Sequence, residues 1–158
     1  MKKESIPTTH QPTLKQDRAA AYFEEGFACA PSVFATYGPP LIDEKTALKI
    51  ADPFAGGMAM SKTCGAVTGA LMVIGLYYGR DRADDAAARD KKLELTKEFL
   101  KRFEEQFETV SCKGLLGYDI AVPEEKDVVV EKGLFDSLCP KFIRGAGKIL
   151  EDLMEKNW

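Results

Sequence analysis

Four cysteines are the residues of this chain whose chemistry could amount to a function. A thiolate is both the nucleophile of disulfide exchange and a ligand for soft metals, so these residues could serve either purpose. No two of them form a C-x-x-C pair, so the sequence lacks the motif that is typical of zinc ribbons and of thioredoxin-like sites. A C-x-x-C-H sequence is also absent, so covalent c-type haem is excluded. The four residues are Cys29, Cys64, Cys112 and Cys139.

The sequence offers only one histidine for catalysis. The only histidine is His10, which lies between Pro7 and Pro12 in a polar stretch that we interpret as a solvated tail. Ser-His-Asp and Cys-His mechanisms would depend on this one residue, so we expect neither. The loop at Gly56-Gly57 does not match the phosphate-binding pattern G-x-x-x-x-G-K-[ST], and we interpret it as a tight turn. Whether the protein is an enzyme stays open.

Each cysteine lies at or near a break in the helical pattern. Cys64 begins a helix, and Cys139 precedes Pro140, a residue favoured in the first turn of a helix. The positive end of the helix dipole favours a nearby thiolate. We therefore expect the lowest thiol pKa at Cys64 or Cys139. Cys29 has the weakest argument for a lowered pKa, because we expect it in mid-helix, just before a kink at Pro31.

The stretch from Cys64 to Gly79 predicts the central element of the fold. It contains no Asp, Glu, Lys or Arg, and it is too short to span a bilayer. It has too little alternation for an ordinary strand, so we predict a buried helix that begins at Cys64. Gly65 and Gly69 place small residues on one side of this helix. They predict the close approach of another helix or of a bound group, and we take them as candidate cofactor-binding positions.

Apolar residues at helical spacing account for most of the remaining chain. A short helix is expected to begin at Pro123, and Val128–Val130 is assigned to a helix or loop because it has no partner strand. The sequence therefore predicts an all-α fold, a compact bundle of about five helices around the central Gly/Ala-rich helix, with no sheet. The other apolar stripes fall in residues 14–37, 43–54, 93–110 and 139–153.

Length and charge favour a single globular domain. The chain has 158 residues and a net charge of −3, so no basic field indicates nucleic acid. We divide it into a flexible tail, residues 1–12, and one four-cysteine helical domain, residues 13–158. No apolar segment follows the first lysines, so we expect no signal peptide, no membrane association and a cytoplasmic location. In a reducing cytoplasm, cysteines are more often free, metal-bound or redox-active than joined in structural disulfides.

Short motifs around the four cysteines resemble those of a known family. The central motif reads C-G-A-x-x-G, and single cysteines occur before and after it in matching places. The motifs occur at residues 26–30, 64–70, 112–117, 133–135 and 138–140. In this order they resemble the C_GCAxxG_C_C family of putative redox-active proteins, and the resemblance extends from about Ala19 to the C-terminus. Pro31, directly after the first motif, departs from the pattern.

The resemblance implies a redox-active site formed by all four cysteines. A similar cysteine set is associated with a [2Fe–2S] cluster in split-Soret cytochrome c, and without a haem-attachment motif only that cluster could carry over. Three functions stay open: electron transfer with the four cysteines as iron–sulfur ligands, reversible disulfide exchange, and a non-catalytic helical module with a Cys₄ zinc site or inert thiols. For the redox functions we expect an unidentified redox partner protein. A homodimer is a further alternative.

Overall fold

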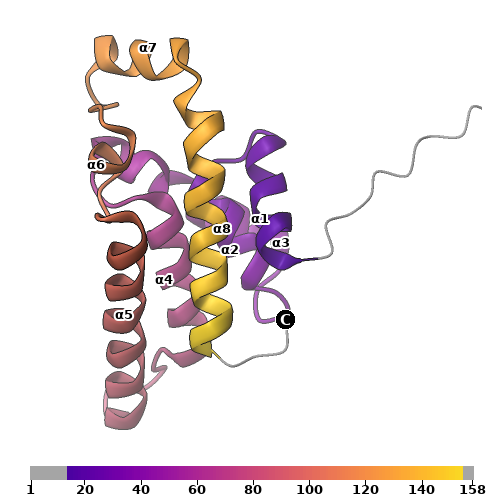
Figure 1. Cartoon of the computed structure of the whole chain (residues 1–158). Helices are drawn as coiled ribbons and strands as arrows, with labels where there is room; N and C mark the ends of the chain where they lie inside the picture. Colours follow the sequence, from indigo (N-terminus) through magenta and orange to yellow (C-terminus); the bar gives the residue numbers. More distant parts are fainter. Residues whose placement is uncertain (1–13, 155–158) are drawn as a thin grey trace, which may run out of the picture.

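The computed structural model describes residues 14–154 and shows an all-helical bundle (Figure 1). The expected tail, residues 1–12 with His10, lies outside the described residues. Within residues 14–154 the regular structure is helical, apart from one isolated bridge between Thr63 and Ser111. The predicted all-α class is therefore confirmed. No helix in this part of the chain combines the length and apolar character that crossing a bilayer requires.

Eight α-helices form the described part of the chain, more than the five or so expected. The additional ones are short, or arise where one apolar stripe is divided between two helices. Two short helical turns, η1 (Asp52–Phe54) and η2 (Gly57–Ser61), precede the central helix. The α-helices are α1 (Lys15–Glu24), α2 (Cys29–Tyr37), α3 (Glu44–Ala51), α4 (Gly65–Tyr78), α5 (Ala86–Phe107), α6 (Cys112–Leu116), α7 (Pro123–Glu131) and α8 (Leu134–Met154).

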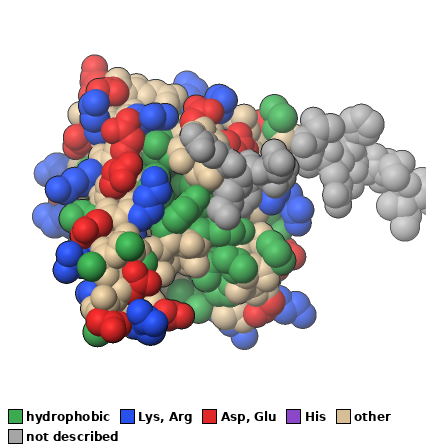
Figure 2. All heavy atoms as spheres, turned by 90° about the horizontal axis from the view of Figure 1, so that it is seen from below, with side chains coloured by type: hydrophobic (Ala, Val, Ile, Leu, Met, Phe, Trp, Pro, Cys, Tyr) green, Lys and Arg blue, Asp and Glu red, His purple; other side chains and the backbone are tan. Residues whose placement is uncertain are grey.

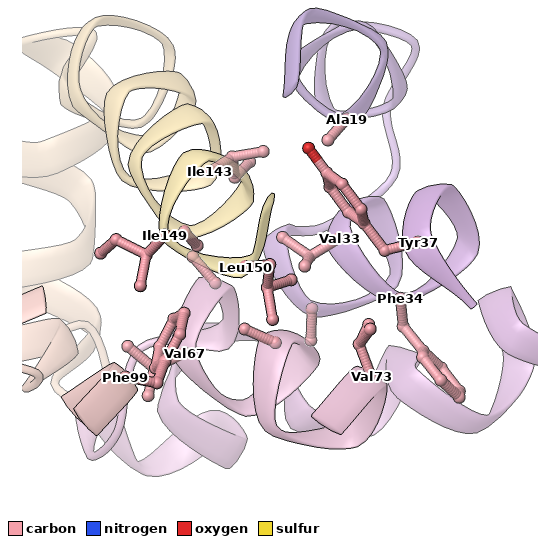
Figure 3. Close-up of a cluster of buried hydrophobic side chains, with 14 of the residues drawn as sticks. Ala19, Val33, Phe34, Tyr37, Val67, Val73, Phe99, Ile143, Ile149 and Leu150 are labelled. Atoms are coloured by element: carbon pink, nitrogen blue, oxygen red, sulfur yellow. The ribbon is translucent and has the colours of Figure 1, made fainter. Parts of the chain in front are cut away.

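Helix α4 is the central element, as the sequence predicts. It packs against α2, α5 and α8, and its buried side chains contribute to one continuous apolar core. In Figure 3, Val67 and Val73 of α4 lie in a cluster with Val33 of α2 and Leu150 of α8. Because α4 is apolar on every side, it needs partner helices around most of its circumference.

The chain breaks before Cys29 rather than after it. Gly26 has a φ of +109°, a conformation that suits glycine, and it separates α1 from α2. Cys29 is the first residue of α2, so Pro31 lies in the first turn, where backbone N–H groups have no acceptor within the helix. The expected kink after Cys29 is wrong because Pro31 occupies a position at which proline interrupts nothing.

The last helix begins earlier than expected. Gly133 has a φ of +63°, and α8 begins at Leu134, so both Cys139 and Pro140 lie inside the helix. The prediction that Cys139-Pro140 opens this helix is therefore wrong. Other local predictions are confirmed, since α7 begins at Pro123 and the Val128–Val130 stretch lies within it.

Charged and apolar side chains gather on different sides of one end of the molecule. Figure 2 shows the face that lies at the bottom of Figure 1, where hydrophobic side chains gather on one side and charged side chains cover most of the other. The long helix α5 carries several ion pairs along its exposed side. Its Glu98 accepts a hydrogen bond from Arg102 at 2.8 Å, an i,i+4 pair on the surface of the helix.

Candidate functional site

All four cysteines line one cavity of about 340 Å³. They come from four separate elements, although 110 positions separate the first from the last (139 − 29). Cys29 is the first residue of α2, Cys64 immediately precedes α4, Cys112 is the first residue of α6, and Cys139 lies within α8. The structure thus brings together the four residues that the sequence singled out. All four are free thiols.

The remaining wall of the cavity is mainly apolar. Asp136, one turn before Cys139 on α8, is the one carboxylate among the described lining residues. An apolar wall of this kind strengthens electrostatic interactions between the sulfurs, because it lowers the local dielectric constant. The larger apolar side chains of the wall are Phe23, Phe27, Leu115, Leu116, Ile120, Phe135 and Phe142.

A two-residue antiparallel pairing positions Cys64 and Cys112. Thr63 and Ser111 form the bridge, and the backbone N–H groups of the two cysteines donate to carbonyl oxygens of the opposite segment at 2.8 and 2.5 Å. Residues on either side of a bridged pair point to the same face of the ladder. The bridge therefore directs both thiols to one side. Sequence analysis missed it because so short a pairing leaves no periodic pattern.

The small residues of α4 allow α2 to approach closely. A Cβ atom on Gly65 would collide with the Cys29 sulfur and would lie 2.9 Å from the backbone nitrogen of Ala30. A Cβ atom on Gly69 would lie 2.5 Å from the carbonyl oxygen of Ala30. Of the two predicted reasons for these glycines, close approach of another helix is the one that the structure shows. Both lie against α2 and neither lines the cavity.

Cys29 carries the lowered thiol pKa of the site. The Cys64 thiol donates a hydrogen bond to the Cys29 sulfur, and this interaction lowers the Cys29 pKa to about 6 despite burial. The backbone N–H groups of Gly56 and Ala30 act in the same direction. The Ala30 N–H is available because Cys29 begins a helix, which the sequence did not predict, whereas Gly56 comes from the loop before α4.

The other three thiols are held protonated. Contact with the Cys29 sulfur, followed by burial, raises the pKa of Cys64 well above its ordinary value. Burial, with a smaller contribution from the charge on Cys29, raises the pKa of Cys112 to about 11 and that of Cys139 to about 12. The expectation that Cys64 or Cys139 has the lowest pKa is therefore wrong. A single thiolate in this cavity disfavours ionisation of its neighbours.

Two further residues act on the thiols and were missed from the sequence. The backbone N–H of Gly56 lowers the pKa of Cys29, and the side chain of Ser61 acts in the same direction on the pKa of Cys112. In the sequence, Gly56 was interpreted only as part of a tight turn. Ser61 carries no recognisable signal, because one serine in a loop is compatible with many roles.

The four cysteines form a set of sulfur donors whose fit to a metal centre depends on the kind of centre. Among the described residues, no group of three or more His, Cys, Asp or Glu side chains is arranged to hold a single metal ion. A [2Fe–2S] cluster makes a different demand, because its four thiolates are shared between two irons. Cys29 and Cys64 already form a contacting pair, and Cys112 and Cys139 complete a Cys₄ set around the same cavity. These residues fit such a cluster in donor type and number.

Comparison with protein families supports the redox interpretation. The family model described as "Putative redox-active protein (C_GCAxxG_C_C)" matches residues 27–153, a span that includes all four cysteines. The chain belongs to this family. No curated protein matches the chain significantly, and neither does any solved structure. Family membership places this protein among four-cysteine proteins described as redox-active, and the expected family resemblance is confirmed.

Proposed function

We propose that the protein transfers electrons through a [2Fe–2S] cluster held by Cys29, Cys64, Cys112 and Cys139. One observation carries the proposal: four cysteines from four separate elements line a single cavity. A reversible disulfide requires two cysteines, whereas a cluster of this type requires four thiolates. Use as a cluster site therefore accounts for all four residues.

The surrounding residues would bind and shield the group. When bound, the cluster supplies one-electron redox chemistry. The apolar wall would limit the access of water to the bound group, and the bridge between Thr63 and Ser111 orients two of the thiols in the metal-free chain. Cys29 and Cys139 are only partly buried, so the edge of the cavity formed by α2 and α8 is where a redox partner could approach the site.

Anaerobic reconstitution with iron and sulfide tests this proposal. We expect a coloured protein with about two irons and two acid-labile sulfides per chain, and a reversible visible spectrum on reduction. Replacing any one cysteine by serine, for example Cys139→Ser, should sharply reduce the iron content. Ser32→Ala is the matched control, because Ser32 is a buried serine that does not line the cavity and whose hydroxyl donates to the carbonyl oxygen of Ala28, the residue before α2. A colourless chain, or unchanged iron in all four cysteine variants, would refute the proposal.

A second candidate function is thiol–disulfide exchange at Cys29 and Cys64. Their thiols are in hydrogen-bond contact, and the lowered pKa makes Cys29 the attacking sulfur. The Cys29 thiolate would attack a substrate disulfide, forming a mixed disulfide and releasing one substrate thiolate. Cys64 would then give its proton to the released substrate thiolate and attack the Cys29 sulfur, releasing the second substrate thiolate. Two electrons pass to the substrate, and a Cys29–Cys64 disulfide remains.

The number of cysteines required separates the two candidates. Disulfide exchange should survive in Cys112→Ser and Cys139→Ser, and it should fail in Cys29→Ser and Cys64→Ser. Equilibration with glutathione buffers, followed by mass spectrometry of alkylated peptides, measures which residues become oxidised. Failure to detect a Cys29–Cys64 disulfide across the range of buffers would reject exchange at this pair.

A further inference from the structure

The four-cysteine cavity opens to solvent between the α1–α2 connection and α8. Among the residues that line it, Gly26, Phe27 and Asp136 are exposed, whereas Cys64 and Cys112 are buried. A lining residue that is also exposed marks a place where the cavity meets solvent. We call the opening formed by the three exposed residues the mouth of the cavity. A reactant that approaches the thiols from solvent therefore passes between a carboxylate and an aromatic ring.

Helix α8 presents a carboxylate on the same side as its cysteine. Asp136 lies three positions before Cys139, and residues at i and i+3 share one face of a helix. Both residues line the cavity. Lys141 lies two positions after Cys139, about 200° around the helix axis, and it does not line the cavity. The described part of α8 therefore brings a negative charge, and no lysine, to the cavity.

Two further carboxylates lie on the other side of the mouth. Glu24 and Glu25 are exposed, and they lie in sequence between Phe23 and Gly26, which both line the cavity. Each glutamate is therefore bonded to a lining residue, with about 3.8 Å between the two Cα atoms. The mouth thus has acidic residues on the α1 side as well as on the α8 side.

The three carboxylates at the mouth keep their charge unpaired within the described chain. Among residues 14–154, no Lys or Arg lies within ion-pair distance of Glu24, Glu25 or Asp136. Lys113, on α6, pairs instead with Asp119 at 3.9 Å. Charge of one sign at a cleft with apolar walls concentrates the electric field there and attracts ions of the opposite sign. The mouth therefore favours the approach of cations.

We propose that Asp136, together with Glu24 and Glu25, makes the four-cysteine site selective for positively charged redox partners. The inference rests on the proposed function and names the charge class of its partner. Complementary charges speed the encounter of two partners, and like charges suppress it. Phe27 is 37% exposed, and its ring packs edge-on against Tyr22 with 5.8 Å between centroids. It offers a partner an apolar contact beside the carboxylates.

Two small oxidants of opposite charge test the inference on the reconstituted protein. Hexaammineruthenium(III) is a trivalent cation, ferricyanide is a trivalent anion, and each accepts one electron from the reduced cluster. Stopped-flow mixing measures the ratio of the two rate constants. Asp136→Asn should lower the ratio of cationic to anionic rate by about tenfold at low salt, and Asp136→Glu should retain the wild-type ratio. A change in the protein's own potential alters both rates in the same direction, so the ratio reports the charge at the mouth.

Asp81→Asn is the matched control, because it makes the same change in net charge far from the cavity. Asp81 is exposed in the connection between α4 and α5, which Figure 1 shows at the end of the molecule away from α6 and α7. This variant should keep the wild-type ratio. Salt at about 1 M should remove the difference between Asp136→Asn and wild type, because screening then acts within about 3 Å. An unchanged ratio in Asp136→Asn, or an equal fall in Asp81→Asn, would overturn the inference.

Charged disulfides keep this inference distinguishable from the proposed function. A wild-type chain that assembles no cluster from iron and sulfide would reject the proposed function. The reduced, metal-free chain would then be treated at one fixed pH with cystamine, a cationic disulfide, and with dithiodipropionate, an anionic one. In each reaction a protein thiolate attacks the reagent, forms a mixed disulfide and releases one reagent thiolate.

The ratio of the two disulfide rates again isolates the charge at the mouth, because both reactions draw on the same fraction of thiolate. Asp136→Asn should lower the ratio of cystamine to dithiodipropionate reaction by about threefold, since these reagents carry less charge than the metal complexes. Mass spectrometry of the mixed disulfides measures both rates. Equal ratios in wild type and Asp136→Asn would overturn the inference whether or not the chain binds a cluster.

Discussion

At the scale of single residues, the charge of the site is concentrated on Cys29. The sequence favoured Cys64 and Cys139, because helix starts were expected there. In the structure the N–H groups and the donating thiol of Cys64 converge on Cys29 instead. The order of the thiol pKa values depends on contacts between residues that are far apart in sequence. The position of each cysteine relative to a helix start could therefore not predict it.

The pH dependence of alkylation tests this assignment. In the reduced, metal-free protein the Cys29 pKa is about 6, whereas an ordinary thiol ionises near about 8.5. The pKa is lowered, so thiolate is present above pH 6 and is lost as the pH falls through that value. Labelling of Cys29 by iodoacetamide should therefore rise through this pH and then level off. Peptide mass spectrometry should find the other three cysteines nearly unlabelled in that range.

Removing the hydrogen-bond donor provides the control. Cys64→Ala should move the Cys29 titration upward, toward the ordinary thiol range, because the largest lowering interaction has been deleted. A wild-type Cys29 that ionises only above about pH 8, near the ordinary thiol value, would contradict the arrangement described for this pair.

At the scale of elements, contact between α2 and α4 brings Cys29 to Cys64. Gly69→Ala would place a methyl group 2.5 Å from the Ala30 carbonyl oxygen, so α2 would have to move. Overpacking of this kind costs about 1–3 kcal/mol, and the better helix propensity of alanine offsets at most about 1 kcal/mol. Urea unfolding should therefore show Gly69→Ala to be destabilised.

Gly75→Ala is the matched control within the same helix. A Cβ atom at Gly75 would meet nothing within 4 Å. Only the propensity gain remains, so this variant should be stabilised by up to about 1 kcal/mol. Equal effects of the two substitutions would show that the close approach of α2 does not depend on the missing side chain at position 69.

Element boundaries show how much of the fold the sequence could predict. Composition and apolar spacing predicted the all-helical class and α4, whose beginning at Gly65 is one residue after the predicted Cys64. The same spacing concealed the break at Gly26, because α1 and α2 both turn apolar residues toward one core and the stripe continues across the gap. The bridge between Thr63 and Ser111 could not be predicted, since it depends on how the segments that precede α4 and α6 meet.

At the scale of the whole molecule, the site exists only when distant segments are folded together. The cysteines belong to elements near the beginning, middle and end of the described chain, as Figure 1 shows for α2, α4, α6 and α8. The motifs predicted that these residues belong to one functional site. The cavity itself required the packing of α8 against the earlier helices, which no local pattern specifies.

Binding of a cluster should therefore stabilise the whole fold. A group that binds the folded chain and not the unfolded chain raises stability by mass action, and four ligands from separate elements cannot be preassembled in the unfolded state. Removing iron with a chelator should lower the melting temperature by several degrees, with the loss seen in one cooperative transition. Thermal unfolding followed by circular dichroism, with and without chelator, measures this.

Cys139→Ser separates stabilisation by the cluster from other effects of the chelator. This variant lacks the ligand from α8, so its melting temperature should be low and insensitive to the chelator. If the melting temperature of the wild type is equally insensitive although iron is removed, the metal does not link these helices. If oxidation raises the melting temperature and iron does not, the stabilising bond is the Cys29–Cys64 disulfide, and the contact between α2 and α4 is the part of the fold that redox chemistry controls.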